Sequence, residues 1–102
     1  MKIVWTEPAV ADLESIRDYI SRDSEHYATR LIERIFETIE NLKKFPNKGR
    51  KVPEAEQENI REILFQNYRI IYQLEKQRII VLTILHSARD LTRRYHKSSD
   101  VD

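Results

Sequence analysis

Apolar residues recur at helical spacing through the first half of the chain. Four of them follow one another at i, i+4, i+7 and i+11: Ala9, Leu13, Ile16 and Ile20. This stripe predicts a helix with one buried side, and a second stripe from Ala28 to Leu42 predicts another helix that ends near Lys44. Thr6 and Ser24 are the expected N-caps. The short connection predicts that the two helices form an antiparallel hairpin.

The period of the pattern changes to two in the second half. Residues 46–59 are polar, contain two of the prolines and the single glycine, and are expected to form a loop. Ile60–Phe65 and Tyr68–Leu74 alternate between apolar and polar and predict two strands. Ile79–Leu85 is apolar at almost every position, which predicts a strand buried on both faces, and residues 2–5 predict a short first strand.

Gln66 and Asn67 predict a two-residue turn between the second and third strands, with the positive φ expected at Asn67. That turn places Phe65 opposite Tyr68 and Arg61 opposite Tyr72. One face of the hairpin then holds mostly apolar residues and is expected to contact the helices: Arg61, Ile63, Phe65, Tyr68, Ile70 and Tyr72. The other face is expected to be open or partly covered: Glu62, Leu64, Arg69, Ile71 and Gln73.

These elements predict a single α+β domain over residues 1–102 with the order β-α-α-β-β-β. The helix hairpin is expected to pack on a small antiparallel sheet. A polar segment at 89–97 predicts a short C-terminal helical turn, within a basic tail from about residue 89 to 102.

Composition narrows the classes of function. The 102 residues include no cysteine, so disulfides, thiolate metal sites and a cysteine nucleophile are excluded. A single glycine excludes the Gly-rich phosphate loops. No apolar run reaches the length of a membrane span, and the N-terminus lacks the layout of a signal peptide. We therefore expect a small cytoplasmic domain with no membrane contact, no cofactor and no metal, since His26, His86 and His96 lack metal-ligand spacing.

The formal net charge of +1 conceals an uneven distribution. Residues 1–45 hold 7 basic and 9 acidic side chains, whereas residues 46–102 hold 11 basic and 8 acidic ones. An anionic partner is therefore expected to meet the sheet, the preceding loop and the tail, rather than the helices.

Two arginines within the predicted strands are candidate binding residues. Arg69 either pairs with Glu62 on the neighbouring strand or presents its guanidinium on the open face for a phosphate or carboxylate. Arg61 lies on the apolar face, where a structural salt bridge with a helical acid is the favoured interpretation and a register shift the alternative.

Basic and aromatic residues also gather after the last strand. His86 ends that strand, where it is either a hydrogen-bonded edge residue or a general acid or base. The tail that follows combines cations with aromatic rings able to stack on bases: Arg89, Arg93, Arg94, Tyr95 and His96. The alternative for the tail is a capped terminal turn with pairs such as Asp90 and Arg94.

Several segments, in their order and spacing, resemble the RelE/ParE superfamily of toxins from bacterial type II toxin–antitoxin modules. They are TEPAVADLESIRDYI, LKKFPNKGRKVPE, IREILFQNYRIIY and ILHSARDL, and they cover nearly the whole chain. The resemblance implies a helix hairpin on a small antiparallel sheet. It also implies a co-expressed antitoxin that wraps the domain and inhibits it. The assembly that the resemblance implies is a homodimer or a hetero-oligomer with the antitoxin.

The superfamily implies two alternative targets. ParE-type members poison DNA gyrase, and RelE-type members cut mRNA in the ribosomal A site. Under the RelE-like alternative the catalytic candidates are Arg69, Arg89, Tyr95 and His86, whereas the loop cations Lys48, Arg50 and Lys51 are displaced from the family's loop lysines. Under the ParE-like alternative there are only binding candidates for target or antitoxin: Arg61, Arg69, Arg89, Arg93 and Arg94.

The small net charge favours the ParE-like interpretation, because a nuclease must neutralise several phosphates and a gyrase poison binds a protein complex. The GRKVPE, NYRIIY and HSARD segments are also closer to that group. An inactive member that only binds an antitoxin is the third hypothesis. Whether the protein is an enzyme depends on this choice.

Overall fold

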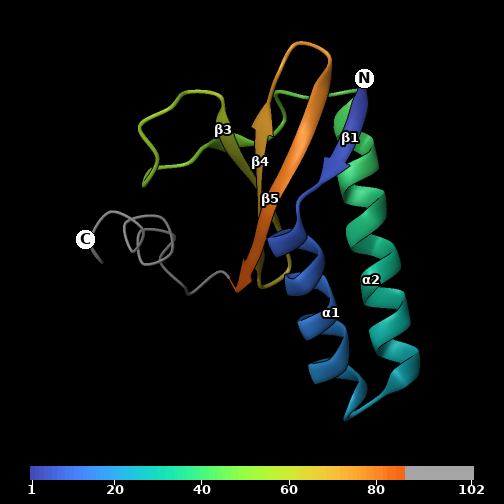
Figure 1. Ribbon diagram of the computed structural model, residues 1–102. Helices are drawn as coiled ribbons and strands as arrows, with labels where there is room; N and C mark the ends of the chain where they lie inside the picture. The colour runs from blue at the N-terminus through green and yellow to red at the C-terminus, as the bar shows by residue number, and fades with distance from the viewer. Residues whose placement is uncertain (87–102) are drawn as a thin grey trace.

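The computed structural model describes residues 1–86, which form two layers, a pair of helices and a sheet (Figure 1). In chain order the elements are β1 (Lys2–Trp5), α1 (Glu7–Ser21), α2 (Glu25–Glu40), a 3₁₀ turn (Asn41–Lys43), β2 (Arg50–Lys51), β3 (Ile60–Phe65), β4 (Tyr68–Leu74) and β5 (Arg78–His86). The predicted α+β class and the helix hairpin are confirmed. The expected C-terminal helical turn lies outside the described residues.

The sheet has the strand order β1-β5-β4-β3-β2. β1 pairs parallel with β5, with Ile3 opposite Ile79, so the sheet is mixed rather than purely antiparallel. This pairing joins the first and last described strands, and the local pattern of neither strand carries a signal for it. β2 lies inside the segment expected to be a loop, and its two residues pair with Glu62 and Arg61 of β3.

The β3–β4 hairpin has the predicted register, with Phe65 opposite Tyr68 and Arg61 opposite Tyr72. The turn differs in one detail, because Gln66 takes the positive φ of 52° that was expected at Asn67. A positive φ at the first turn residue suits the twist of a hairpin, although a side chain there carries a steric cost that glycine avoids.

Polar side chains fix where each helix starts and how α1 meets the sheet. The Thr6 hydroxyl accepts a hydrogen bond from the Ala9 N–H and donates to the carbonyls of Val81 and Leu82. Ser24 accepts from the Tyr27 N–H at the start of α2. Both predicted N-caps are confirmed, and Thr6 also ties α1 to β5.

The helices cover one face of the sheet (Figure 1). The buried cluster between the two layers draws on both helices and on β4 and β5: Ala9, Leu13, Leu31, Ile35, Ile39, Ile70, Val81 and Ile84. Ile63, Phe65 and Tyr68 pack against it, so the hairpin face predicted to be apolar does contact the helices. A smaller cluster of Leu42, Tyr72 and Ile79 closes this layer beside the 3₁₀ turn.

The opposite face is covered in part by the segment between β2 and β3. Val52 of that segment and Ile60 of β3 are both buried and pack with Ile71 and Leu85. β5 therefore has buried residues on both faces, as its nearly continuous apolar run predicted. Neither described helix is long and apolar enough to cross a membrane.

Candidate functional site

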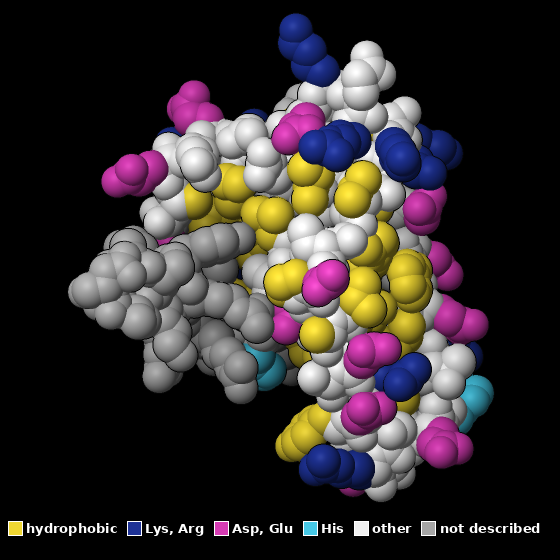
Figure 2. All heavy atoms as spheres, in the orientation of Figure 1, with side chains coloured by type: hydrophobic (Ala, Val, Ile, Leu, Met, Phe, Trp, Pro, Cys, Tyr) yellow, Lys and Arg dark blue, Asp and Glu magenta, His cyan; other side chains and the backbone are white. Residues whose placement is uncertain are grey.

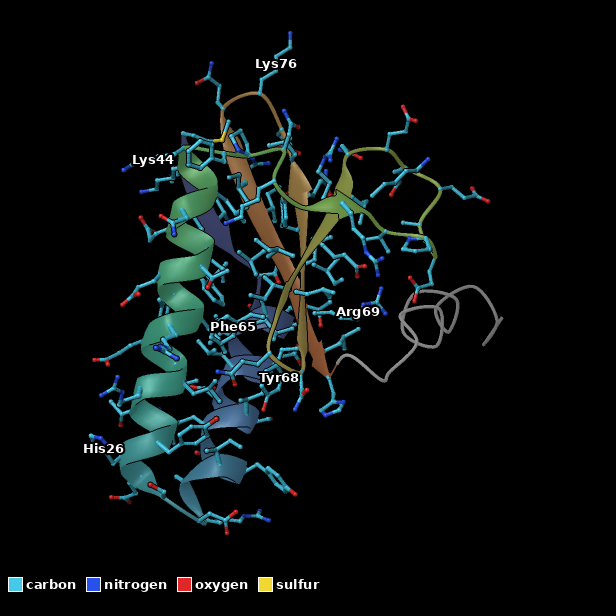
Figure 3. The ribbon with its side chains drawn as sticks, turned by 180° about the vertical axis from the view of Figure 1, so that it is seen from behind. His26, Lys44, Phe65, Tyr68, Arg69 and Lys76 are labelled. Atoms are coloured by element: carbon cyan, nitrogen blue, oxygen red, sulfur yellow. The ribbon has the colours of Figure 1, made fainter. Side chains whose placement is uncertain are left out.

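Arg69 of β4 lies on the sheet face that the helices leave uncovered, with its side chain only 8% exposed (Figure 3). Its Nε donates to Glu62 Oε1 at 2.6 Å. Its two terminal nitrogens donate to the carboxylate of Glu54, with Nη1 to Oε2 at 3.0 Å and Nη2 to Oε1 at 2.8 Å. The pairing with Glu62 that the alternation allowed is therefore present. Glu54 adds the bidentate geometry that a planar guanidinium favours.

Glu62 is the centre of this network. Its side chain is fully buried, and each carboxylate oxygen accepts from a different arginine, because Arg50 Nε donates to Oε2 at 2.5 Å. The β2–β3 register places Arg50 opposite Glu62, and Arg69 is the diagonal neighbour on the other side, since it opposes Leu64. The two short pairings therefore hold two guanidinium groups against one buried carboxylate.

A hollow of about 260 Å³ lies beside the network, lined by Arg50, Pro53, Glu54, Leu64 and Arg69. The Leu64 side chain is exposed and forms an apolar wall, whereas Arg50 keeps a side chain that is 63% exposed. Arg50 is thus the arginine of the network that is more exposed to solvent.

Among residues 1–86, the network pairs two arginines with two glutamates. The hydrogen bonds from Arg69 to Glu54 raise the pKa of Arg69 above its ordinary value; burial opposes this rise, and Glu62 adds to it. The hydrogen bonds therefore favour the charged form of Arg69. A phosphate or carboxylate ligand would have to replace Glu54 to receive the same pair of hydrogen bonds.

Arg61 occupies a different place and lacks the predicted salt bridge within the described chain. Its Nη1 donates to the Gly49 carbonyl at 2.8 Å, so a backbone oxygen takes the role expected of a helical acid. The register is as predicted, and the error lies in the partner. The preceding loop approaches β3 closely enough to supply that oxygen.

The same loop meets the buried hydroxyl of Tyr72, which accepts from the Gly49 N–H at 3.0 Å and donates to the Pro46 carbonyl at 2.8 Å. A Cβ atom on Gly49 would lie 2.5 Å from that hydroxyl oxygen, so the position requires glycine because of this contact. Burial raises the pKa of Tyr72, and the Gly49 hydrogen bond and the charge of Arg61 oppose the rise.

His86 is exposed at the end of β5, with its ring edge-on to Tyr68 at a centroid distance of 6.1 Å. It lies at the opposite end of β4 from Tyr72. Burial raises the pKa of Tyr68, with smaller contributions from Tyr27 and Tyr19. The remaining candidates, Arg89, Arg93, Arg94 and Tyr95, lie outside the described residues.

Of the residues singled out from the sequence, the structure joins Arg69 and Arg50 through Glu62 and leaves Arg61 on the other face. Glu54 was missed, because it lies in a loop whose path no periodicity predicts. Lys51 pairs with exposed Glu58 at 3.6 Å, away from the buried carboxylates. The alternation did contain the signal for Glu62, since it placed that residue diagonally across from Arg69.

The comparisons with known proteins all point to toxins of type II toxin–antitoxin systems. Residues 3–91 match the family described as ParE toxin of type II toxin–antitoxin system, parDE. The chain is 33% identical over 89 residues to Toxin RelE2 of Caulobacter vibrioides, covering 86% of this chain and 97% of that protein.

Two solved structures share the fold. The chromosomal ParDE toxin–antitoxin system from P. aeruginosa superposes with a TM-score of 0.70 at 25% identity, covering 84% of this chain and 95% of that one. The toxin–antitoxin complex RelBE2 from Mycobacterium tuberculosis gives a TM-score of 0.62 at 17% identity, covering 83% and 95%. With the match over residues 3–91, these findings show that the chain belongs to the ParE toxin family, within the RelE/ParE superfamily of type II toxins.

Proposed function

We propose that this toxin inhibits growth by poisoning DNA gyrase in the cytoplasm and that a cognate antitoxin neutralises it. The observation that carries the choice of target is that the Arg69 guanidinium is hydrogen-bonded to two glutamates and nearly buried. The RelE-like alternative needs this arginine to stabilise charge on a phosphate during cleavage. Here its donors are bonded to Glu54 and Glu62, and its side chain is 8% exposed.

The overall charge supports the same target. Each phosphate contact strengthens binding to RNA, and a nuclease that works on the ribosome needs several of them. A net charge of +1 leaves little surplus for that purpose. A target that includes a protein surface makes no such demand.

The surface of the helices supports a protein partner. Large apolar side chains stand exposed on α1 and α2, among them Val10, Tyr19, Tyr27 and Phe36. Hydrophobic side chains also gather over this side of the molecule (Figure 2). Contiguous exposed apolar surface usually marks an interaction site, and the similar solved structures are toxin–antitoxin systems. An antitoxin that covers the helices is the occupant we propose.

One observation favours ribosome-dependent mRNA cleavage as the second candidate. This chain is 33% identical to Toxin RelE2 over 89 residues. The resemblance to the superfamily also implies that Arg69 matches the catalytic arginine of the strand. Under this candidate Glu54 would leave Arg69 when the phosphate arrives. Arg89, Tyr95 and His86 would complete the site.

The deciding experiment compares two assays on the purified full chain. We expect dose-dependent loss of gyrase supercoiling of relaxed plasmid, relieved by the antitoxin encoded next to the gene, and no mRNA cleavage on programmed ribosomes. The double variant Arg93→Ala/Arg94→Ala should weaken inhibition if the basic tail contacts the target. Arg30→Ala/Arg34→Ala on exposed positions of α2 removes the same charge and serves as the matched control.

Unimpaired supercoiling together with ribosome-dependent cleavage would replace gyrase by the ribosome as the target. In that case Arg69→Lys, which keeps the charge, should lose cleavage while circular dichroism shows that the fold is retained. Tight antitoxin binding without toxicity, gyrase inhibition or cleavage would identify an inactive member that serves only as a binding module.

A further inference from the structure

The segment after α2 carries an exposed aromatic ring beside a surface hollow. This hollow of about 630 Å³ is lined by the five consecutive residues 44–48, which we call the Phe45 loop: Lys44, Phe45, Pro46, Asn47 and Lys48. The Phe45 side chain is 62% exposed, and Lys44 lies directly after the 3₁₀ turn that follows α2 (Figure 3). A ring with this much exposed surface contributes little to the hydrophobic core.

The Phe45 loop is held in place from beneath. The N–H groups of Lys44 and Phe45 donate to the Asn41 carbonyl, and the Lys48 N–H donates to the Phe45 carbonyl. Tyr72 then fastens both sides of the loop through the Pro46 carbonyl and the Gly49 N–H. Because Tyr72 is fully buried, the ring of Phe45 is presented on a frame tied to the core.

The charge around the ring is positive. Residues 43–51 contain five basic and no acidic residues, and Lys and Arg side chains gather at this end of the molecule (Figure 2). Three of these cations have acidic partners, since Lys43 pairs with Glu40, Arg50 with Glu62 and Lys51 with Glu58. Within residues 1–86, no ion pair involves Lys44 or Lys48, the two lysines that flank Phe45.

We propose that the Phe45 loop binds single-stranded nucleic acid, with one base stacked on the Phe45 ring and phosphates contacting Lys44 and Lys48. A positive groove with an aromatic platform is the usual arrangement for such strands, because every base has a face that can stack. An acidic peptide is the weaker fit, since lysine is depleted from protein–protein interfaces. Asn47 provides a donor and an acceptor for a base edge.

This site is separate from the Arg69 network, and its existence does not depend on which target the toxin attacks. It adds a contact with a nucleic-acid strand to the protein contacts proposed above. The test uses neither gyrase nor ribosomes, so the two proposals succeed or fail separately.

The first measurement is fluorescence anisotropy of a labelled short oligothymidylate titrated with the full chain at low salt. We expect saturable binding that Phe45→Ala weakens roughly tenfold, the usual effect of removing one stacking ring. Tyr19→Ala is the matched control, because Tyr19 is 67% exposed on α1, outside the Phe45 loop. Absence of saturable binding, or a Phe45→Ala variant that binds like the wild type, would overturn the proposal.

The second measurement is the salt dependence of binding. Each phosphate contact on a single strand contributes about 0.7 to the slope of log K against log salt. We expect Lys44→Ala and Lys48→Ala each to lower the slope by about that amount. Arg30→Ala, at an exposed position in the first half of α2, removes one positive charge far from the Phe45 loop and should leave the slope unchanged. An equal fall for Arg30→Ala would show a general charge effect and contradict the site.

The third measurement identifies what is recognised. An abasic strand of the same length carries the phosphates without the rings and should bind roughly tenfold more weakly. Equal binding of the abasic strand, or of an oligoglutamate peptide, would overturn base stacking at Phe45. Oligouridylate compared with oligothymidylate reports whether RNA or DNA is preferred, and either preference agrees with the proposal.

Discussion

The two faces of the sheet are built from different interactions. The face toward the helices is apolar, with Ile35 and Ile70 fully buried at its centre. The opposite face keeps a buried ion-pair network of Arg69, Glu62 and Glu54 beside a small apolar cluster. Apolar burial needs no angular precision, whereas the hydrogen bonds of a guanidinium require fixed directions.

The difference indicates what each face contributes. Removing apolar surface from water supplies the free energy that holds the helices to the sheet. A buried ion pair contributes little net stability, because the cost of desolvating both charges offsets their attraction. The network instead anchors the segment between β2 and β3 at Glu54, so the loop takes one path over the sheet.

The largest expected effect follows from removing the charge at the centre of the network. Glu62→Gln leaves Arg69 with one carboxylate partner and Arg50 with none among those described, and we expect a loss of about 3–5 kcal/mol in the free energy of unfolding. Urea denaturation followed by circular dichroism measures it. Glu58→Gln changes an exposed pair and should cost under about 1 kcal/mol. Similar values for both variants would show that the network is not anchored as described.

The apolar face is tested at Ile35, whose side chain is completely buried between the layers. Ile35→Ala should cost about 2–5 kcal/mol through lost burial and a residual cavity. Thr29→Ala, on the exposed surface of α2, is the control and should be close to neutral. Added salt should leave the cost at Ile35 unchanged, since no charge is involved; a strong salt dependence would argue against a purely apolar layer.

Tyr72 brings a polar group to the apolar face, and its hydroxyl makes two hydrogen bonds to the loop. Tyr72→Phe should cost about 1–3 kcal/mol at neutral pH, because the Gly49 N–H loses its buried acceptor.

The cost of Tyr72→Phe should shrink at alkaline pH. The pKa of Tyr72 in the folded protein is raised above its ordinary value of 10.0, so the folded state holds the phenolic proton more tightly than the unfolded state. Wild-type stability therefore falls as the pH rises above about 10, and the phenylalanine variant lacks this contribution. Urea titrations at neutral and alkaline pH measure it, with exposed Tyr19→Phe as the control. A cost that grows with pH would contradict the raised pKa.

The smallest effect is expected at the solvent edge of the network. Arg50 has a side chain that is 63% exposed, so water screens much of its attraction to Glu62. Arg50→Gln should cost only about 0–1 kcal/mol and should lose that cost in high salt. A loss as large as that of Glu62→Gln would mean that both arginines, rather than Arg69 alone, anchor the buried carboxylate.

Local patterns predicted the elements that depend on local signals. The helix stripes, both N-caps and the Phe65–Tyr68 register follow from spacing and turn length, and all three are confirmed. The parallel β1–β5 pair could not be predicted this way, because neither strand's own pattern specifies its neighbour. β2 has only two residues, which is too short for any periodicity.

The candidate site shows the same difference between partners that a local pattern predicts and partners that it does not. The diagonal relation of Glu62 and Arg69 follows from strand alternation, so their pairing was among the alternatives. Glu54 enters from a loop, and the wrong partner for Arg61 has the same origin, because the Gly49 carbonyl also belongs to a loop. Backbone atoms of loops are partners that side-chain patterns do not show.

The β1–β5 pairing has a consequence for how the chain acquires its structure. Thr6 bonds to Val81, 75 residues away, and Asp12 of α1 accepts hydrogen bonds from Thr83 and the Ile84 N–H. During synthesis the first strand and helix leave the ribosome long before β5 exists to receive them. Long-range contacts of this kind close last and slow folding. A nascent chain therefore cannot complete its sheet until β5, its last described strand, has emerged from the ribosome.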